Sequence, residues 1–259
     1  MQEKANFPIV TEVAGEEISS EQLQKNLSRY LWAEGFSRDK DVLEIACGAG
    51  QGLGILNRSA GNFVAGDLTE ELVHSAKRHY TDRVALCRFA AESMPFPGKS
   101  FDVLILFEAI YYLRSVNEFL RECRRILRPG GKVLIATANK DLYDFNPSPY
   151  SITYYGVVDL TALFANEGFG TEFFGDTNVY NVSYRQRLLR PIKKVAVALN
   201  LIPKTMKGKR WLKRLIFGEL QPMPAELMTD HGSYLPPEPI RGDRPDTEHK
   251  TILCAATLM

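Results

Sequence analysis

The sequence predicts a doubly wound α/β domain, in which a mostly parallel sheet carries helices on both faces. Apolar, strand-like runs alternate with helix-like stripes over residues 40–176. The run 101–107 is nearly all apolar, as expected for a strand buried on both of its faces. A glycine turn at 47–50 follows the first apolar run. The length of 259 residues fits one large domain, or one domain with an insertion.

The expected elements follow from apolar spacing and from helix-capping residues. Ser19 with Gln22, and Ser115 with Glu118, have the spacing of a capping box, and Thr69 is a plausible N-cap. Helices are therefore expected over 18–35, after Thr69, after Ser115 and over 158–167. The expected strands are 42–46, 62–67, 83–88, 101–107, 132–137, 170–175 and 250–258.

The composition excludes several classes of protein. Apolar residues make up 45% and charged residues 24%, which is typical of a soluble domain. No run approaches 18 apolar residues, and the first residues lack the apolar core of a secretion signal. The cysteines are widely spaced and form no CxxC pair, which indicates a reduced, cytoplasmic chain without a structural metal site. These cysteines are Cys47, Cys87, Cys123 and Cys254.

A basic segment interrupts the alternation of strands and helices. Residues 177–220 contain eleven Lys or Arg and one acid, although the whole chain has a net charge of only +1. Two basic helices are expected there, over 183–200 and 205–217, before a proline-rich tail. The expected organisation is an N-terminal helical cap (1–36), a core (37–176), a basic and Pro-rich insertion acting as acceptor lid (177–248) and a final core strand (249–259).

The glycine turn and one aspartate predict a nucleoside site. In Glu44-Ile45-Ala46-Cys47-Gly48-Ala49-Gly50, the glycines allow close approach of backbone to a ligand. Asp67 ends the second strand 17 residues later, where a carboxylate can accept both ribose hydroxyls. Leu53 replaces the third glycine of a pyrophosphate cradle, and Glu44 would repel a pyrophosphate but suits an ammonium group. A nucleoside joined to an amino acid describes S-adenosylmethionine.

Four motifs resemble those of class I S-adenosylmethionine-dependent methyltransferases of the type 11 kind. Residues 42–52 are similar to motif I of that family, and Asp67 matches its ribose-binding acid. Residues 89–102 and 127–131 are similar to its D-A-E-x-L-P-F and L-R/K-P-G-G segments. The resemblance implies a Rossmann-like sheet of seven strands in the order 3-2-1-4-5-7-6, with the seventh antiparallel. It also implies S-adenosyl-L-methionine as cofactor and S-adenosyl-L-homocysteine as product, and no metal.

The resemblance also implies which residues line the cofactor site. Leu68 should pack on the adenine, and Tyr30 lies in a helix that covers the cofactor in this family. Ala90 departs from the family pattern, which often has an Asp there for the adenine amino group. The Ala91 N–H could still meet an adenine ring nitrogen, and Glu92 or water could replace the lost acceptor. The expected cofactor residues are Tyr30, Glu44, Ala46, Gly48, Gly50, Asp67, Leu68, Ala91, Glu92 and Phe107.

Three residues are candidates for the reaction face. Glu108 and Tyr112 follow the fourth strand, where this family meets its acceptor, although either could simply seal the site. His231 is the histidine of the expected lid and a candidate general base, with a solvated loop histidine as the alternative.

The acceptor class rests on the insertion and on a weaker resemblance. Residues 144–218 look like methyltransferases of surface-polysaccharide and sugar biosynthesis, so O-methylation of a sugar, nucleotide sugar or glycan intermediate is expected. The alternatives are a quinone, polyketide or lipid-like acceptor, or a non-catalytic binding module. The basic segment indicates a solvated face, a site for an anionic acceptor or transient contact with an anionic membrane. No aromatic RNA-binding motif accompanies it, which argues against nucleic acid. The oligomeric state stays open.

Overall fold

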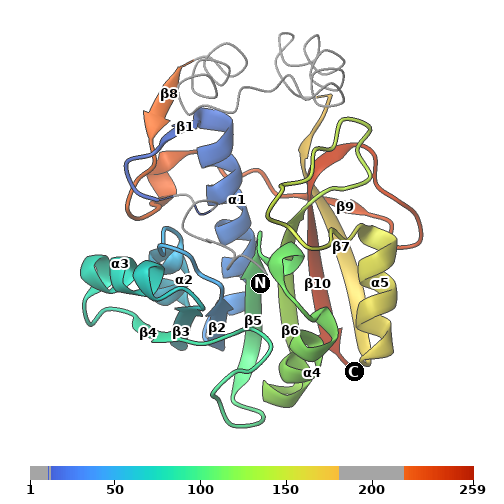
Figure 1. Cartoon of the computed structure of the whole chain (residues 1–259), viewed down its shortest axis with the longest axis horizontal. Helices are drawn as coiled ribbons and strands as arrows, with labels where there is room; N and C mark the ends of the chain where they lie inside the picture. The colour runs from blue at the N-terminus through green and yellow to red at the C-terminus, as the bar shows by residue number, and fades with distance from the viewer. Residues whose placement is uncertain (1–10, 12, 181–218) are drawn as a thin grey trace.

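The computed structural model describes residues 11, 13–180 and 219–259, and its centre is a twisted sheet (Figure 1). In the described residues this sheet has eight strands in the order β4-β3-β2-β5-β6-β10-β7-β9. Strands β4 to β6 are parallel, whereas β10 runs antiparallel to both β6 and β7. The strands are β2 (Asp41–Ile45), β3 (Asn62–Asp67), β4 (Ala85–Arg88), β5 (Phe101–Phe107), β6 (Leu127–Ala138), β7 (Phe169–Asn178), β9 (Glu238–Ile240) and β10 (His249–Leu258).

The seven expected strands lie in the expected order, and β9 adds an eighth that the sequence analysis missed. Residues Glu238–Ile240 pair antiparallel with the outer edge of β7, where Ile240 lies opposite Phe173. The central residue of β9 is Pro239, which lacks an N–H and is tolerated only at a sheet edge. A three-residue strand around a proline carries no alternating pattern, so its sequence did not indicate a strand.

Helices cover both faces of the sheet, as expected (Figure 1). Strand β5 shows how the alternation of side chains separates two apolar clusters. Val103 and Ile105 pack with the residues of α1 and α2, whereas Leu104 and Leu106 pack with those of α4 and α5. Burying one such side chain contributes about 1.5–3 kcal/mol, which explains the unbroken apolar run. The helices are α1 (Ser20–Ser37), α2 (Leu53–Ser59), α3 (Glu70–Tyr80), α4 (Val116–Ile126) and α5 (Val157–Asn166).

The predicted helix caps are present. The Ser19 hydroxyl accepts from the Gln22 N–H at 3.1 Å, and the Ser115 hydroxyl accepts from the Glu118 N–H at 3.3 Å. Thr69 is the N-cap of α3, without a capping bond from its side chain. The boundaries of several elements move by one to five residues, and the largest change is β6, which begins at Leu127 rather than at 132.

The return of the insertion joins the N-terminal cap in a second, two-stranded sheet. Strand β1 (Glu17–Ser19) pairs antiparallel with β8 (Leu220–Pro222). The Met223 N–H then donates to the Glu16 carbonyl at 2.8 Å. The expected cap and insertion are therefore linked by backbone hydrogen bonds. The two basic helices expected over 183–200 and 205–217 lie outside the described residues.

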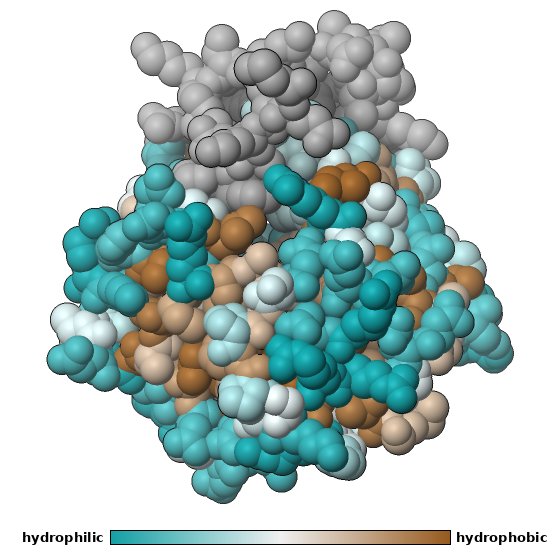
Figure 2. All heavy atoms as spheres, turned by 60° about the horizontal axis from the view of Figure 1, so that its bottom comes forward, coloured by the Kyte–Doolittle hydropathy of each residue, from teal (hydrophilic) through white to brown (hydrophobic). Residues whose placement is uncertain are grey.

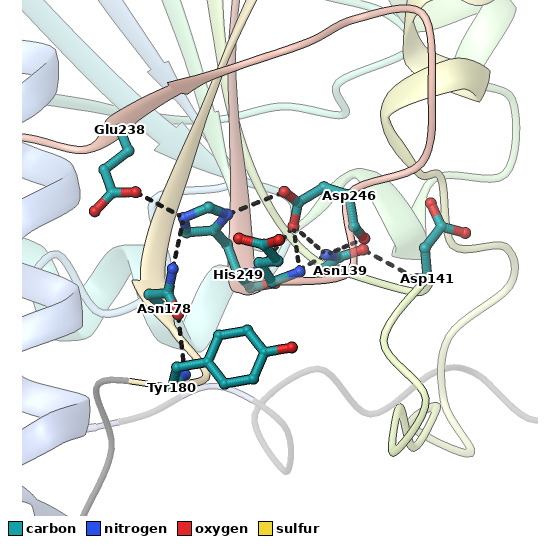
Figure 3. Close-up of polar contacts among 8 residues, drawn as sticks. Asn139, Asp141, Asn178, Tyr180, Glu238, Asp246 and His249 are labelled. Atoms are coloured by element: carbon teal, nitrogen blue, oxygen red, sulfur yellow. Dashed lines mark hydrogen bonds and ion pairs between the residues drawn. The ribbon is translucent and has the colours of Figure 1, made fainter.

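A polar cluster fixes the insertion where it re-enters the sheet as β10 (Figure 3). His249 is buried, and its Nδ1 lies 3.0 Å from a carboxylate oxygen of Asp246. On its other side, Nε2 lies 3.4 Å from Glu238 on β9 and 3.5 Å from Asn178 on β7. The Asn139 amide donates to the His249 carbonyl at 2.8 Å. The cluster therefore ties together the ends of β6 and β7, the edge strand β9 and the start of β10.

The surface is mixed in character. Figure 2 shows hydrophilic side chains over much of the face that looks down in Figure 1, with apolar residues gathered toward its left. None of the described helices is long and apolar enough to cross a membrane. All four cysteines carry free thiols. Among the described residues, no group of three His, Cys, Asp or Glu side chains could hold a metal ion.

Candidate functional site

A cavity of about 840 Å³ opens at the carboxyl ends of the parallel strands. It lies where the chain order reverses in the sheet, because β3 and β4 extend to one side of β2, whereas β5 and β6 extend to the other. Ligands of doubly wound α/β proteins bind at such a switch point. Helix α1 and the residues after β8 contribute to its wall. Its volume is within the usual range for small-molecule sites.

The glycine turn after β2 forms one end of the cavity. Gly48 has φ of +59° and Gly50 has φ of +89°, backbone conformations in which glycine is favoured. Ala46 and Gly48 line the cavity. Gly50 does not, because it faces α3, where an added Cβ would lie 3.1 Å from Ala76. Ala46 and Gly48 therefore lie where a ligand would contact them, and Gly50 lets the turn pack closely on α3.

Asp67 lies beside this turn at the end of β3. Its Oδ2 accepts from the Gly48 N–H at 3.0 Å, and its Oδ1 accepts from the Thr69 N–H at 2.8 Å. Burial raises the pKa of Asp67, whereas these two N–H groups lower it. Each carboxylate oxygen has a second lone pair for a further donor. The carboxylate is thus held in a fixed orientation in which it can also accept the two hydroxyls of a ribose.

Glu44 lines the same cavity and has one buried oxygen without a hydrogen-bond partner among the described residues. The Tyr30 hydroxyl donates to Oε1 of Glu44 at 2.7 Å. The second oxygen, Oε2, is buried and has no hydrogen-bond partner among the described residues. Burial raises the pKa of Glu44 to about 7, against the hydrogen bond from Tyr30 and the charge of Arg29. A buried polar atom normally has a partner, so Oε2 fits the ammonium group of an amino acid ligand.

The far side of the turn has the character of an adenine site. Leu68 lines the cavity and is 45% exposed. Its apolar side chain is therefore available to pack against a flat ring. Ala90, Ala91 and Glu92 also line this side. Oε1 of Glu92 accepts from the Arg114 N–H at 2.9 Å, so this carboxylate is held by the chain itself.

Glu108 also lines the cavity. Its backbone has φ of +51°, which a non-glycine residue seldom adopts. Lys25 Nζ and Arg29 Nη1 of α1 lie 3.2 and 3.8 Å from its Oε1, and the Tyr111 hydroxyl donates to Oε2 at 2.9 Å. Burial acts to raise the pKa of Glu108, but the charges of Lys25 and Arg29 outweigh it and hold that pKa below the usual value. Glu108 is therefore a fixed, ionised acceptor of hydrogen bonds.

The remaining expected residues divide between the cavity and the outside. Phe107 lines the cavity and packs edge to face on Tyr30, with ring centroids 5.4 Å apart, and Tyr112 lines it half-buried. His231 does not line it. The 3-10 turn η3 (Thr229–His231) leaves His231 exposed, where its Nδ1 accepts from the Met228 N–H at 3.0 Å. The expectation that His231 acts as a base at the reaction face finds no support in this geometry.

Several lining residues were not expected from the sequence. Lys25 and Arg29 are four residues apart and therefore lie on the same face of α1. This spacing, next to Tyr30, was the feature of the sequence that could have predicted their position in the cavity. Met223 and Leu227 line the cavity near Gln51 and belong to the returning insertion. Their sequence context, rich in proline, gave no indication of that position.

The fold is that of a Rossmann-like α/β domain, and Glu44 and Asp67 in its cavity have the chemistry expected of a site for a nucleoside that carries an amino acid. Residues 43–135 match the family model described as a methyltransferase domain. This segment is therefore similar to the methyltransferase domain family.

Known proteins of similar sequence are named as methyltransferases. A probable S-adenosylmethionine-dependent methyltransferase of Mycolicibacterium smegmatis is 31% identical over 137 residues, which cover 51% of this chain and 53% of that protein. A ubiquinone biosynthesis O-methyltransferase of Sinorhizobium medicae is 30% identical over 122 residues, covering 42% and 49%. The chain thus spans about half the length of the curated relatives it matches. The name of the first of these relatives and the carboxylates of Glu44 and Asp67 are both consistent with S-adenosylmethionine as the cofactor.

A solved structure supports the fold. A SAM-dependent methyltransferase of Thermotoga maritima superposes with a TM-score of 0.58 and 12% identity, covering 93% of this chain and 92% of that one. At this identity the likeness concerns the fold alone.

Proposed function

We propose that this chain transfers a methyl group from S-adenosylmethionine to a hydroxyl group of a small-molecule acceptor. The observation that supports it is that one cavity is lined by Glu44, Asp67 and Glu108 together. When bound, the cofactor supplies a methyl group on a positively charged sulfur, already activated for displacement.

The chain's own residues bind, orient and accept a proton. Asp67 holds the ribose hydroxyls, and Glu44, positioned by Tyr30, holds the ammonium group. Glu108 accepts a hydrogen bond from the acceptor hydroxyl and takes its proton as the new bond forms. Lys25 and Arg29 keep that carboxylate in place. Holding the hydroxyl about 3 Å from the methyl carbon can by itself contribute about 7–11 kcal/mol to the lowering of the barrier.

Within this activity we propose a sugar, nucleotide sugar or glycan intermediate as acceptor. The charged and hydrogen-bonding side chains Lys25, Arg29 and Glu108 in the cavity suit a ligand with several hydroxyl groups. A quinone, polyketide or lipid-like acceptor is the second candidate. It is favoured by Tyr150 and Ile152, cavity-lining side chains that are 46% and 58% exposed, and by the similarity to a ubiquinone O-methyltransferase.

Methyl transfer from labelled S-adenosylmethionine to acceptor panels tests both parts. One panel contains nucleotide sugars and free sugars, and the other contains quinols and phenolic lipids. We expect transfer to the first panel, and transfer confined to the second would refute the sugar acceptor while preserving the activity. Binding of S-adenosylhomocysteine without transfer to any acceptor would favour a non-catalytic binding module. The free thiols suit a reducing compartment, so we propose that the chain acts in the cytoplasm.

A further inference from the structure

The insertion returns to the core as a strap over the glycine-turn end of the cavity. We define the strap as residues 220–228, which begin with β8. Met223 and Leu227 are 4% and 0% exposed and form part of the cavity wall beside Gln51. The Leu227 N–H donates to the Gln51 carbonyl at 2.7 Å, within the loop between β2 and α2. The strap therefore forms part of the cavity wall at the loop that contains the glycine turn.

One carboxylate in the strap is surrounded by two arginines and a histidine of the core. Glu226 Oε2 lies 2.9 Å from His79 Nε2 and 3.0 Å from Arg83 Nη2, and Oε1 lies 3.4 Å from Arg58 Nη1. Its side chain is only 12% exposed. Burial acts to raise the pKa of Glu226, but Arg83 and His79 outweigh it and lower that pKa. Glu226 is thus an ionised anchor between the strap and helices α2 and α3.

The core leaves a space of matching size for this anchor. A Cβ at Gly54 of α2 would lie 1.8 Å from Glu226 Oε1 and 2.6 Å from its Cδ. Any larger residue at position 54 would therefore displace the carboxylate. Glu226 itself does not line the cavity, so the anchor and the cofactor surface are separate parts of the strap.

We propose that Glu226 is a positioning residue that holds the strap closed, and that the cofactor binds and leaves through opening of the strap. This inference rests on the proposed function, since it concerns the same cofactor. Because the anchor lies outside the cavity, it stabilises the closed strap equally with and without cofactor. Weakening it raises the population of the open strap in both states, so both rate constants rise while the equilibrium affinity hardly changes.

The kinetics of S-adenosylhomocysteine binding to the immobilised full chain test this inference. Glu226→Gln keeps the shape of the side chain and removes its charge. Gly54→Ala displaces the same carboxylate from the other side, and alanine favours a helix more than glycine does. Asp243→Asn is the control, because it removes the ion pair to Arg241 elsewhere in the insertion. For both test variants we expect association and dissociation each to become about fivefold faster, with Kd changed by less than about twofold.

Other outcomes overturn the inference. If only dissociation accelerates and Kd rises in proportion, Glu226 merely supports the cavity wall. Rates equal to those of the control variant would show that the strap does not limit exchange. If Glu226→Gln fails to fold, Gly54→Ala decides the result.

Hydrogen exchange of the Leu227 amide without cofactor separates the two proposals. Faster exchange in Glu226→Gln is expected, because this amide is bonded to Gln51 only when the strap is closed. If the native chain binds no S-adenosylhomocysteine, the proposed function fails and so does the role of the strap in cofactor exchange. If the native chain binds S-adenosylhomocysteine but the Leu227 amide exchanges equally fast in Glu226→Gln and in the native chain, only the role of Glu226 as anchor is refuted.

Discussion

The hydroxyl of Tyr30 donates a 2.7 Å hydrogen bond to Oε1 of Glu44 and so joins the N-terminal helix to the first strand of the core. Both residues are buried, and Oε2 of Glu44 has no hydrogen-bond partner among the described residues. The arrangement gives Glu44 a pKa of about 7 through burial. Its charge therefore changes in the range of pH in which cofactor binding is measured.

Cofactor affinity should rise with pH through about 7. Only ionised Glu44 pairs with the ammonium group of S-adenosylhomocysteine. That α-amino group also titrates, but it does so equally in measurements on the native chain and on any variant. Calorimetry between pH 6 and pH 8.5 should therefore show an increase that Glu44→Gln lacks, together with weaker binding by the variant above pH 7. Identical pH profiles for the two proteins would contradict a role for Glu44 in binding the ammonium group.

The stability of the chain without cofactor should change in the opposite direction. The folded pKa of Glu44, about 7, lies above its ordinary value of 4.5. Between these values the folded state keeps a proton that the unfolded state has lost, so stability falls as pH rises from 4.5 through 7. The loss is on the order of 3 kcal/mol. Urea unfolding at pH 5 and pH 8 measures it, and Glu44→Gln should remove most of the difference between them.

Replacing Asp67 should weaken cofactor binding strongly. Asp67→Ala removes the ribose acceptors and leaves the Gly48 and Thr69 N–H groups without their partner, at a cost of about 1–3 kcal/mol in binding. Asp67→Asn keeps one carbonyl oxygen and should bind with intermediate affinity. Calorimetry with S-adenosylhomocysteine gives both values, and thermal unfolding shows that the variants are folded. Native affinity in Asp67→Ala would refute the ribose site.

Gly52 should be required for the position of Tyr30. An added Cβ at position 52 would lie 2.1 Å from the Tyr30 ring, so Gly52→Ala must displace the ring and break its hydrogen bond to Glu44. We expect a loss of stability of about 1–3 kcal/mol and weaker cofactor binding. Gly35→Ala in α1 is the matched control, because a Cβ there meets no atom within 4 Å. It should leave binding unchanged and stability equal or slightly higher.

Glu108 should affect turnover rather than cofactor binding. In Glu108→Gln the acceptor hydroxyl loses its proton acceptor, and kcat should fall about 10²- to 10⁴-fold at unchanged affinity for S-adenosylhomocysteine. Tyr111→Phe removes one hydrogen bond to Glu108 and keeps the charge, so its kcat should fall less than about tenfold. Both are measured once an acceptor is identified. A Glu108→Gln variant with native kcat would mean that Glu108 only closes the cavity wall through its ion pairs with Lys25 and Arg29.

The sequence by itself determined the elements of the core and the position of the glycine turn beside Asp67. Apolar spacing and capping residues are local signals, and they gave β3 and β5 with their observed bounds. The glycine turn and Asp67 could be predicted because they immediately follow strands, so the ends of parallel strands bring them together.

The tertiary structure decided which residues surround Glu108 and where the strap lies. The contacts of Glu108 with Lys25, and of Glu226 with His79, join residues that are 83 and 147 positions apart. No periodicity encodes such pairs, because each depends on how a helix or a returning insertion docks on the core. The same reason explains why His231, near in sequence to the strap, lies outside the cavity, whereas Leu227 lies in its wall. Local sequence patterns determine the helices and strands, whereas long-range packing determines which side chains lie together in the cavity.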